Sequence, residues 1–285
     1  MQTFVTSLDS NFVRPTAVML VSLDRNLEEN AKCIILTNFQ DLQVVQTCIS
    51  KLPTSKLSFE FIAVPEDKLN KTLDMDGILH FSTAATYRLL ASTMIDDRTD
   101  AIIYLDGDIL VRDSINSRTF PYVTFAALIE LNPDSDVVYL PGYVNSGVYT
   151  TKLSYWRINR CEEKLVEFLK KNPHSIYKDQ DALNAIFSHV NSKPLRKDLN
   201  YIVQDYNFIK NLSSNPKIVH FAGPLKPWKL TTPNSKFVKE WRKLARELEL
   251  YPTRNSTLPD LFLRLAYTLR IQILIRKFRK LSRNI

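Results

Sequence analysis

Short apolar segments alternate with longer amphipathic segments along roughly the first hundred residues of the chain. The apolar segments predict strands at 3–8, 33–37 and 59–64 and a fourth in the run that starts at Ala101, and the segments between them predict helices over 17–23, 41–51 and 83–94. Because strands that alternate with helices build parallel sheets, we expect an α/β fold whose mostly parallel sheet is covered on both faces.

This alternation changes in the second half of the chain. The elements predicted there are short strands at 123–129, 137–140 and 218–220, and helices over 154–170 and 179–187. No repeat and no low-complexity linker separates them. A length of 285 residues fits one large α/β domain or two small ones. We expect a single domain over 1–253, followed by a basic tail over 254–285.

The tripeptide Asp106-Gly107-Asp108 stands at the carboxyl end of the apolar run that starts at Ala101. Along an extended segment, alternate side chains point to the same face, so the two carboxylates are expected side by side. Two neighbouring carboxylates repel each other unless a cation neutralises them. The motif therefore favours a divalent metal held against a phosphate, although a solvated turn after a strand has the same pattern.

Polar residues follow two of the predicted strands. Asp9 and Asn11 follow the first strand, and Asp106 and Asp108 stand at the carboxyl end of the fourth. In open α/β sheets the ligand lies outside the carboxyl ends of the strands, so we expect these residues in one crevice. The chain has only five glycines, and neither a dinucleotide-binding motif nor a P-loop can be assembled from them. A phosphate would have to be held by metal and side chains.

His220 follows a short apolar strand, and Lys226 comes six residues later. Imidazole and carboxylates together suit Mn²⁺, and a lysine can reach a diphosphate as a point charge. A lone histidine is more often a structural residue. Likewise Asp179 and Gln180 open a predicted helix, where acids commonly cap the helix and can equally face a polar substrate. Asn145-Ser146-Gly147 fits a β-bulge or a turn.

These segments together have a known pattern. The chain resembles glycosyltransferase family 8, which includes glycogenin, plant galactinol synthases and bacterial lipopolysaccharide α-glycosyltransferases. The resemblance runs from about Thr3 to Trp228. It is carried by Asp9-Ser10-Asn11, Thr86-Tyr87-Arg88, Tyr104 to Asp108, Asn145-Ser146-Gly147, Asp179-Gln180-Asp181 and His220 to Trp228.

The resemblance implies a GT-A fold and a retaining hexosyltransferase that uses a UDP-sugar with Mn²⁺, or Mg²⁺ in its place. It implies that the metal ligands are Asp106, Asp108 and His220. The other donor-binding residues that it implies are Asp9 and Asn11 at the uridine, Gly223 and Lys226 at the phosphates, and Arg88, Asn145, Asp179 and Gln180 around the sugar, with Gly107 also in the donor site.

Retention of the anomeric configuration normally needs two displacements, with a carboxylate that flanks the sugar at roughly 5 Å. Gln180 is an amide and a poor nucleophile. Either Asp179 serves as the nucleophile, or the acceptor attacks from the face of the leaving phosphate, whose oxygen takes the acceptor proton. The second route fits the residues better, and the sequence leaves both open.

The acceptor is less defined than the donor. In the lipopolysaccharide galactosyltransferase branch an aspartate occupies the position that Glu130 matches, so we expect Glu130 at the acceptor. Phe12 stands where the family often has tyrosine, and it would still stack on uracil. The favoured acceptor is a saccharide of lipooligosaccharide or another surface glycan. Rival hypotheses are glycosylation of a protein, as in glycogenin or adhesin modification, and a non-catalytic relative that only binds the nucleotide sugar.

The net charge of +8 is concentrated in the tail, where 254–285 holds eight basic residues and one acidic residue. This placement argues against a nucleic-acid partner, which needs a basic docking surface across the body. Leu, Ile and Phe interleave with the basic residues, which favours an amphipathic helix on an anionic membrane; a tail packed on the domain is the alternative. The three cysteines form no C-x-x-C, and no signal peptide or spanning segment is evident. We therefore expect a cytoplasmic protein that is peripheral on the inner face of the cell membrane.

Overall fold

A computed structural model describes most of the chain up to residue 250. The described residues are 1–65, 84–129, 142–175, 177–187, 190, 194–203, 215–222, 226–229 and 232–250. The strand predicted over 137–140, the candidate residues Glu130 and Gly223, and the whole tail lie outside them. Among the helices that are described, none combines the length and the apolar content that crossing a bilayer requires.

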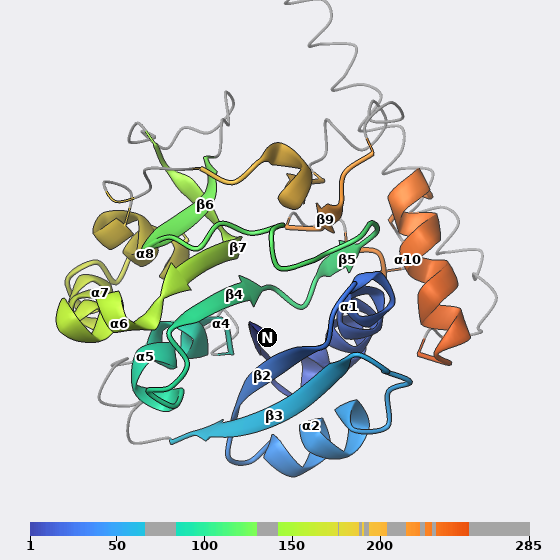
Figure 1. The fold of residues 1–285 in the computed structure, drawn as a ribbon, viewed down its shortest axis with the longest axis horizontal. Coiled ribbons are helices and arrows are strands. Elements are labelled where there is room, and N and C mark those ends of the chain that lie inside the picture. The colour runs from blue at the N-terminus through green and yellow to red at the C-terminus, as the bar shows by residue number, and fades with distance from the viewer. Residues whose placement is uncertain are drawn as a thin grey trace, which may run out of the picture.

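A six-stranded sheet forms the centre of the molecule, in the order β3-β2-β1-β4-β7-β6 (Figure 1). Its strands are β1 (Gln2–Ser7), β2 (Ala31–Asn38), β3 (Leu57–Val64), β4 (Ala101–Leu105), β6 (Phe125–Ile129) and β7 (Val144–Lys152). The first four run parallel, and β7 runs antiparallel to both β4 and β6. The expected mostly parallel α/β sheet is confirmed.

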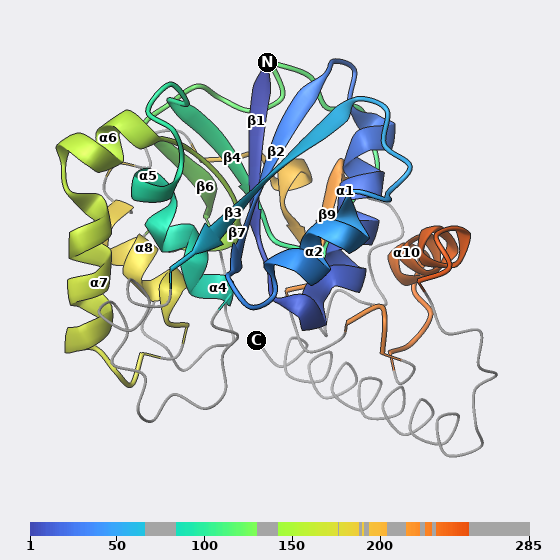
Figure 2. The same cartoon turned by 90° about the horizontal axis from the view of Figure 1, so that it is seen from below.

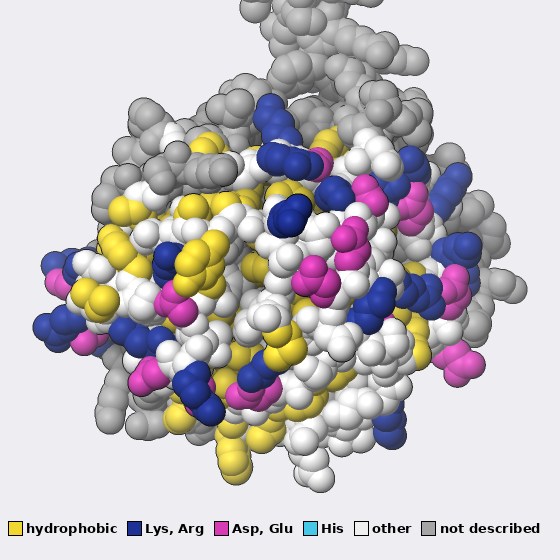
Figure 3. Space-filling model, in the orientation of Figure 1, with side chains coloured by type: hydrophobic (Ala, Val, Ile, Leu, Met, Phe, Trp, Pro, Cys, Tyr) yellow, Lys and Arg dark blue, Asp and Glu magenta, His cyan; other side chains and the backbone are white. Residues whose placement is uncertain are grey.

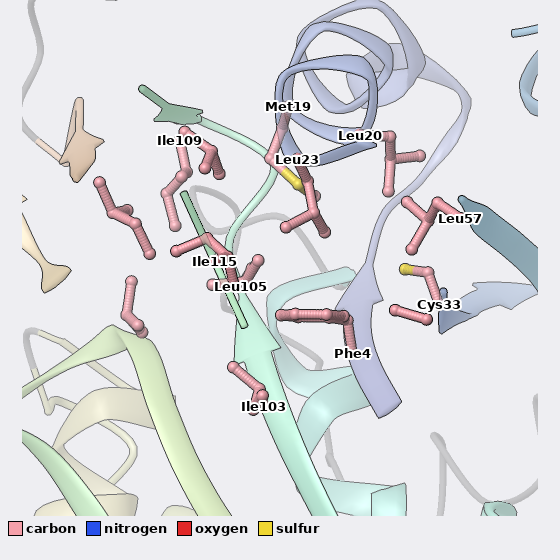
Figure 4. Close-up of a cluster of buried hydrophobic side chains, with 14 of the residues drawn as sticks. Phe4, Met19, Leu20, Leu23, Cys33, Leu57, Ile103, Leu105, Ile109 and Ile115 are labelled. Carbon is pink, nitrogen blue, oxygen red and sulfur yellow. The ribbon is translucent and has the colours of Figure 1, made fainter. Parts of the chain in front are cut away.

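Helices cover both faces of this sheet (Figure 2). One face carries α1 (Val13–Asn26) and α2 (Leu42–Ile49), and the other carries α4 (Ala84–Tyr87), α5 (Ala91–Met94), α6 (Leu153–Ile158), α7 (Cys161–Lys171) and α8 (Asp179–Phe187). Figure 4 shows the first interface, in which side chains of α1 meet those of β1, β2 and β4. α10 (Lys236–Glu247) packs beside α1.

A second, three-stranded sheet stands next to the first, in the order β5-β9-β8. It consists of β5 (Ile109–Val111), β9 (Ile218–His220) and β8 (Tyr201–Ile202). The predicted fourth strand is β4, and Asp106 and Asp108 follow its carboxyl end as expected. The sequence pattern did not indicate that the chain enters a different sheet at Ile109. The aspartates lie in residues 106–108, the crossing that connects the two sheets.

Two predicted helices are also divided. The segment predicted over 83–94 contains a 3-10 turn, η2 (Arg88–Leu90), between α4 and α5, and all three of its residues are buried. The segment predicted as one helix over 154–170 forms two helices, α6 and α7. Between them stands Arg160, whose backbone is left-handed (φ 51°). A left-handed residue cannot continue a right-handed helix, so α7 starts in a new direction.

A buried carboxylate ties α1 to the start of β3. Asp24 accepts hydrogen bonds from the backbone N–H groups of Ser55, Lys56 and Leu57 at 2.7–3.0 Å. Each such donor would cost about 1–3 kcal/mol if it were left buried without an acceptor. These bonds fix α1 against the parallel strands, and α1 in turn packs on the crossing that holds the aspartates.

Candidate active site

Two strands of the small sheet bring the acidic motif to the histidine. β5 and β9 pair antiparallel, with Ile109 opposite His220. Asp108 Oδ1 consequently lies 3.2 Å from His220 Nε2, and Asp106 Oδ2 lies 3.7 Å from the same nitrogen. One ligand atom from each of the three residues lies within 4.8 Å of the others. The structure thus brings Asp106, Asp108 and His220 together.

This cluster has the chemistry of a divalent-cation site. Two carboxylates and an imidazole are ligands that Mn²⁺ and similar ions accept. Asp108 Oδ1 is buried and has no hydrogen-bond donor among the described residues, so it faces the cluster with its lone pairs open. Burial raises the pKa of Asp108, but Lys226 and His220 outweigh it and hold the pKa well below its usual range. The residues present fit a bound cation.

Lys226 completes the charge around this cluster. Its ammonium donates to Asp108 Oδ2 at 2.6 Å and to the carbonyl oxygen of Phe221 at 2.6 Å. A cation that stands beside the carboxylate pair is placed to attract an anionic ligand as well. Contact of Lys226 with a phosphate stays a prediction.

A buried arginine connects the acidic motif to α8. The guanidinium of Arg88 contacts Asp106 Oδ1 at 3.1 Å and Asp179 Oδ2 at 2.7 Å. It also donates to the carbonyl oxygen of Ser146 at 2.8 Å and stacks over the ring of Tyr104, 4.7 Å from the centroid. Burial alone would lower the pKa of Arg88, but the two carboxylates raise it above its ordinary value, so the side chain stays charged.

Asp179 and Gln180, at the start of α8, both face this network. Burial raises the pKa of Asp179 to about 6, although Arg88 acts in the opposite direction. Gln180 Oε1 accepts from the backbone N–H of Ser146 at 3.1 Å and from Asn145 Nδ2 at 3.2 Å. Gln180 Nε2 donates to the hydroxyl of Tyr143 at 3.1 Å. Both ends of the amide are engaged, so these residues do more than cap a helix.

Asn145-Ser146-Gly147 lies within β7, at the point where the register of this strand with β6 shifts, so the segment is an irregular part of a strand and not a turn. Gly147 borders the cluster closely. A Cβ added there would lie 2.7 Å from His220 Nε2 and 2.8 Å from Asp106 Oδ2, which is too close for any side chain. Glycine at this position is what lets β7 approach the ligand atoms.

Asp9 and Asn11 lie at the edge of the same region. Asp9 Oδ1 accepts from the backbone N–H groups of Asn11 and Phe12 and caps the 3-10 turn η1 (Ser10–Phe12). A Cβ on Gly107 would meet the ring of Phe12 at 3.0 Å, which places η1 against the turn of the acidic motif. The side chain of Asn11 is exposed. The approach of Phe12 to Gly107 supports the common crevice that we expect at the ends of β1 and β4.

Sequence reasoning missed two residues of the site. Asn200, fully buried after η4 (Lys197–Leu199), lies with its Oδ1 3.0 Å from His220 Nδ1. Tyr104 donates to Asp106 Oδ1 at 3.0 Å and lies 2.8 Å from Ser7 Oγ. The alternation along β4 could have indicated that Tyr104 shares a face with Asp106. No pattern around Asn200 points to His220, which is distant in sequence.

Comparison with known proteins agrees with this geometry. The model of Glycosyl transferase family 8 matches residues 3–119 and 135–232. General stress protein A of Bacillus subtilis (strain 168) is 27% identical over 258 residues, which cover 80% of this chain and 87% of that protein. A lipopolysaccharide 1,2-glucosyltransferase of Escherichia coli is 26% identical, over 78% of this chain and 71% of its own length.

Solved structures share the fold. The galactosyltransferase LgtC, crystallised with donor and acceptor sugar analogues, has a TM-score of 0.68 at 21% identity, over 88% of this chain and 98% of that one. The glycosyltransferase GlyE of Streptococcus pneumoniae TIGR4 has a TM-score of 0.61 at 16% identity, over 86% of this chain and 61% of its own. At these identities the likeness shows the fold, which is of the GT-A type.

Proposed function

This chain belongs to glycosyltransferase family 8, and on that premise we propose that it transfers a hexose, galactose or glucose, from a UDP-sugar to a saccharide acceptor with retention of the anomeric configuration. The observation that carries this proposal is the convergence of Asp106, Asp108 and His220 on one point. These three residues would hold Mn²⁺ or Mg²⁺. When bound, such a cation supplies positive charge that offsets the charge developing on the leaving diphosphate.

Side chains around the cluster would hold the rest of the donor. Lys226 already stands beside Asp108, at the position where a diphosphate would gain a second positive charge. Asp9 and Asn11 would hold the uridine, with Phe12 against the base, and Gly107 would let the donor approach the turn. Asn145 would line the sugar pocket with Arg88.

The contacts of Asp179 and Gln180 favour attack from the face of the leaving phosphate. Gln180 Oε1 accepts hydrogen bonds that lower its nucleophilicity, and its nitrogen is held by Tyr143. Asp179 is buried in an ion pair with Arg88, so its approach to an anomeric carbon would break that pair. We infer that the acceptor oxygen bonds to the anomeric carbon as the bond to the phosphate breaks, and that the leaving phosphate oxygen takes the acceptor proton.

The acceptor that we propose is a sugar of lipooligosaccharide or a related surface glycan. The names of two relatives support this. The Escherichia coli relative is named a lipopolysaccharide 1,2-glucosyltransferase. A relative from Salmonella typhimurium (strain LT2) is named a lipopolysaccharide 1,3-galactosyltransferase, and it is 31% identical over 51% of this chain and 50% of its own length. Glu130 would contact the acceptor. The basic tail, 254–285, would bring the enzyme to the inner face of the membrane, where lipid-linked acceptors lie.

The test is donor hydrolysis by the full chain. We expect UDP release from UDP-galactose or UDP-glucose in the presence of Mn²⁺, and its loss on chelation. Asp106→Asn and Asp108→Asn should each reduce the rate by at least about 100-fold, because each removes several kcal/mol of stabilisation of the leaving group.

Asp113→Asn is the matched control, since Asp113 is half-exposed on the loop after β5 and pairs with Lys217 instead of the cluster. It should keep the wild-type rate. Unchanged UDP release in both cluster variants would refute the metal assignment, and no release from any UDP-hexose by the wild type would refute the donor class.

A further inference from the structure

A row of buried amides leads from β7 to the histidine of the cluster. Gly147 N–H donates to Asn145 Oδ1 at 3.0 Å, and Asn200 Nδ2 donates to the same oxygen at 3.0 Å. The other end of the Asn200 amide, Oδ1, lies 3.0 Å from His220 Nδ1. Asn145, Asn200 and His220 are all buried, so water does not compete for these bonds.

The polarity of this row follows from its first member. A backbone N–H can only donate, so the Asn145 atom that faces Gly147 must be oxygen. That oxygen cannot donate, so Asn200 must turn its NH₂ group toward it. The carbonyl oxygen of Asn200 then faces His220, and an oxygen without a proton can only accept. His220 Nδ1 must therefore carry the proton.

We propose that Asn200 is a positioning residue: it holds His220 in the tautomer that is protonated on Nδ1, with the lone pair of Nε2 directed at Asp106 and Asp108. This proposal deepens the proposed function and rests on it, because the lone pair on Nε2 is what a cation between the carboxylates would bind. Histidine ligands generally need such an outer hydrogen bond to fix the ring, and its loss typically weakens metal binding 10–100-fold.

Two readouts on the full chain test the proposal. The first is the tautomer in metal-free protein, from long-range ¹H–¹⁵N spectra of ¹⁵N-histidine-labelled samples, in which the His220→Gln variant identifies the signal among the four histidines. We expect protonated Nδ1 in the wild type. The second is the affinity for Mn²⁺ alone, from the electron paramagnetic resonance of free Mn²⁺. Asn200→Leu removes the acceptor at similar volume and should weaken Mn²⁺ binding about 10–100-fold.

Asn200→Asp keeps an oxygen opposite Nδ1 and should bind Mn²⁺ more tightly than Asn200→Leu. Asn184→Leu is the matched control, because Asn184 is equally buried and hydrogen-bonds to Val144 and Gln180 instead of His220. It should leave the tautomer of His220 unchanged.

The outcomes separate this inference from the proposed function. A wild-type His220 that carries no proton on Nδ1 would overturn the inference, and so would equal Mn²⁺ affinity of the wild type and Asn200→Leu. A wild type that binds no Mn²⁺ would count against the proposed metal site, while the tautomer would still decide the role of Asn200. If Asn200→Leu does not fold, the wild-type spectrum alone decides.

Discussion

At the scale of single residues, the site depends on how closely β7 approaches the cluster. The three candidate ligands come from the crossing after β4 and from the end of β9, and β7 passes directly beside them at Gly147. Any side chain there would occupy the space that His220 and Asp106 now fill. The absence of a Cβ is therefore as much a part of the site as the carboxylates.

We predict that Gly147→Ala weakens Mn²⁺ binding by at least about tenfold, because the added methyl group would displace His220 or Asp106 from the cluster. The effect should appear in calorimetric titration of the folded variant with Mn²⁺.

Gly142→Ala is the control for this change. Gly142 has φ 87° but nothing within 4 Å of its Cβ position, so alanine there costs stability through backbone strain without touching the cluster. Both variants should melt below the wild type, and only Gly147→Ala should lose Mn²⁺ affinity. Wild-type Mn²⁺ binding by Gly147→Ala would show that the approach of β7 is not required.

At the scale of elements, the sequence predicted the frame of the site better than its interior. The apolar segments located β1, β2 and β3 within a few residues, since buried parallel strands are continuous apolar runs. The same rule located β4 but gave no sign of β5, because the three apolar residues Ile109–Val111 do not show by themselves that they pair in a different sheet. Only pairing of Ile109 with His220, which is 111 positions away, shows that a second sheet begins there.

The candidate site residues likewise divide into those that the sequence can predict and those that it cannot. Asp106, Asp108 and His220 could be predicted because their chemistry and order form a pattern along the chain. Asp179 and Gln180 could be predicted from that pattern but not from their position, since acids at a helix start usually cap it. Asn200 could not be predicted, because its role depends on partners in β7 and β9 that are close only in space.

At the scale of the whole molecule, charge is divided between the body and the tail. Figure 3 shows basic and acidic side chains interspersed on one face of the described residues, without a broad field of one sign. The tail over 254–285 carries eight basic residues and one acidic residue, and we propose it as the part that meets an anionic membrane. Juxtamembrane Lys and Arg residues contribute about 1 kcal/mol each near such a surface.

We predict that replacing Arg276, Lys277, Arg279 and Lys280 together by glutamine weakens binding of the full chain to vesicles that contain phosphatidylserine by at least about 100-fold. Sedimentation with these vesicles measures the effect. The wild-type chain should bind neutral vesicles weakly and should release anionic ones at high salt. Equal sedimentation of variant and wild type would exclude the basic pairs as the contact, and tighter binding of the wild type to DNA would indicate a nucleic-acid partner instead.

The central claim is that the crossing after β4 and the end of β9 together hold one divalent cation that grips a sugar nucleotide. Diffraction at the manganese absorption edge, from crystals of the full chain grown with MnCl₂ and UDP, tests it most directly. We expect one anomalous peak within about 2.5 Å of a carboxylate oxygen of Asp106, a carboxylate oxygen of Asp108 and Nε2 of His220, with UDP phosphate oxygens beside it. A bound UDP without such a peak, or a peak from which the imidazole of His220 is turned away, would contradict the claim.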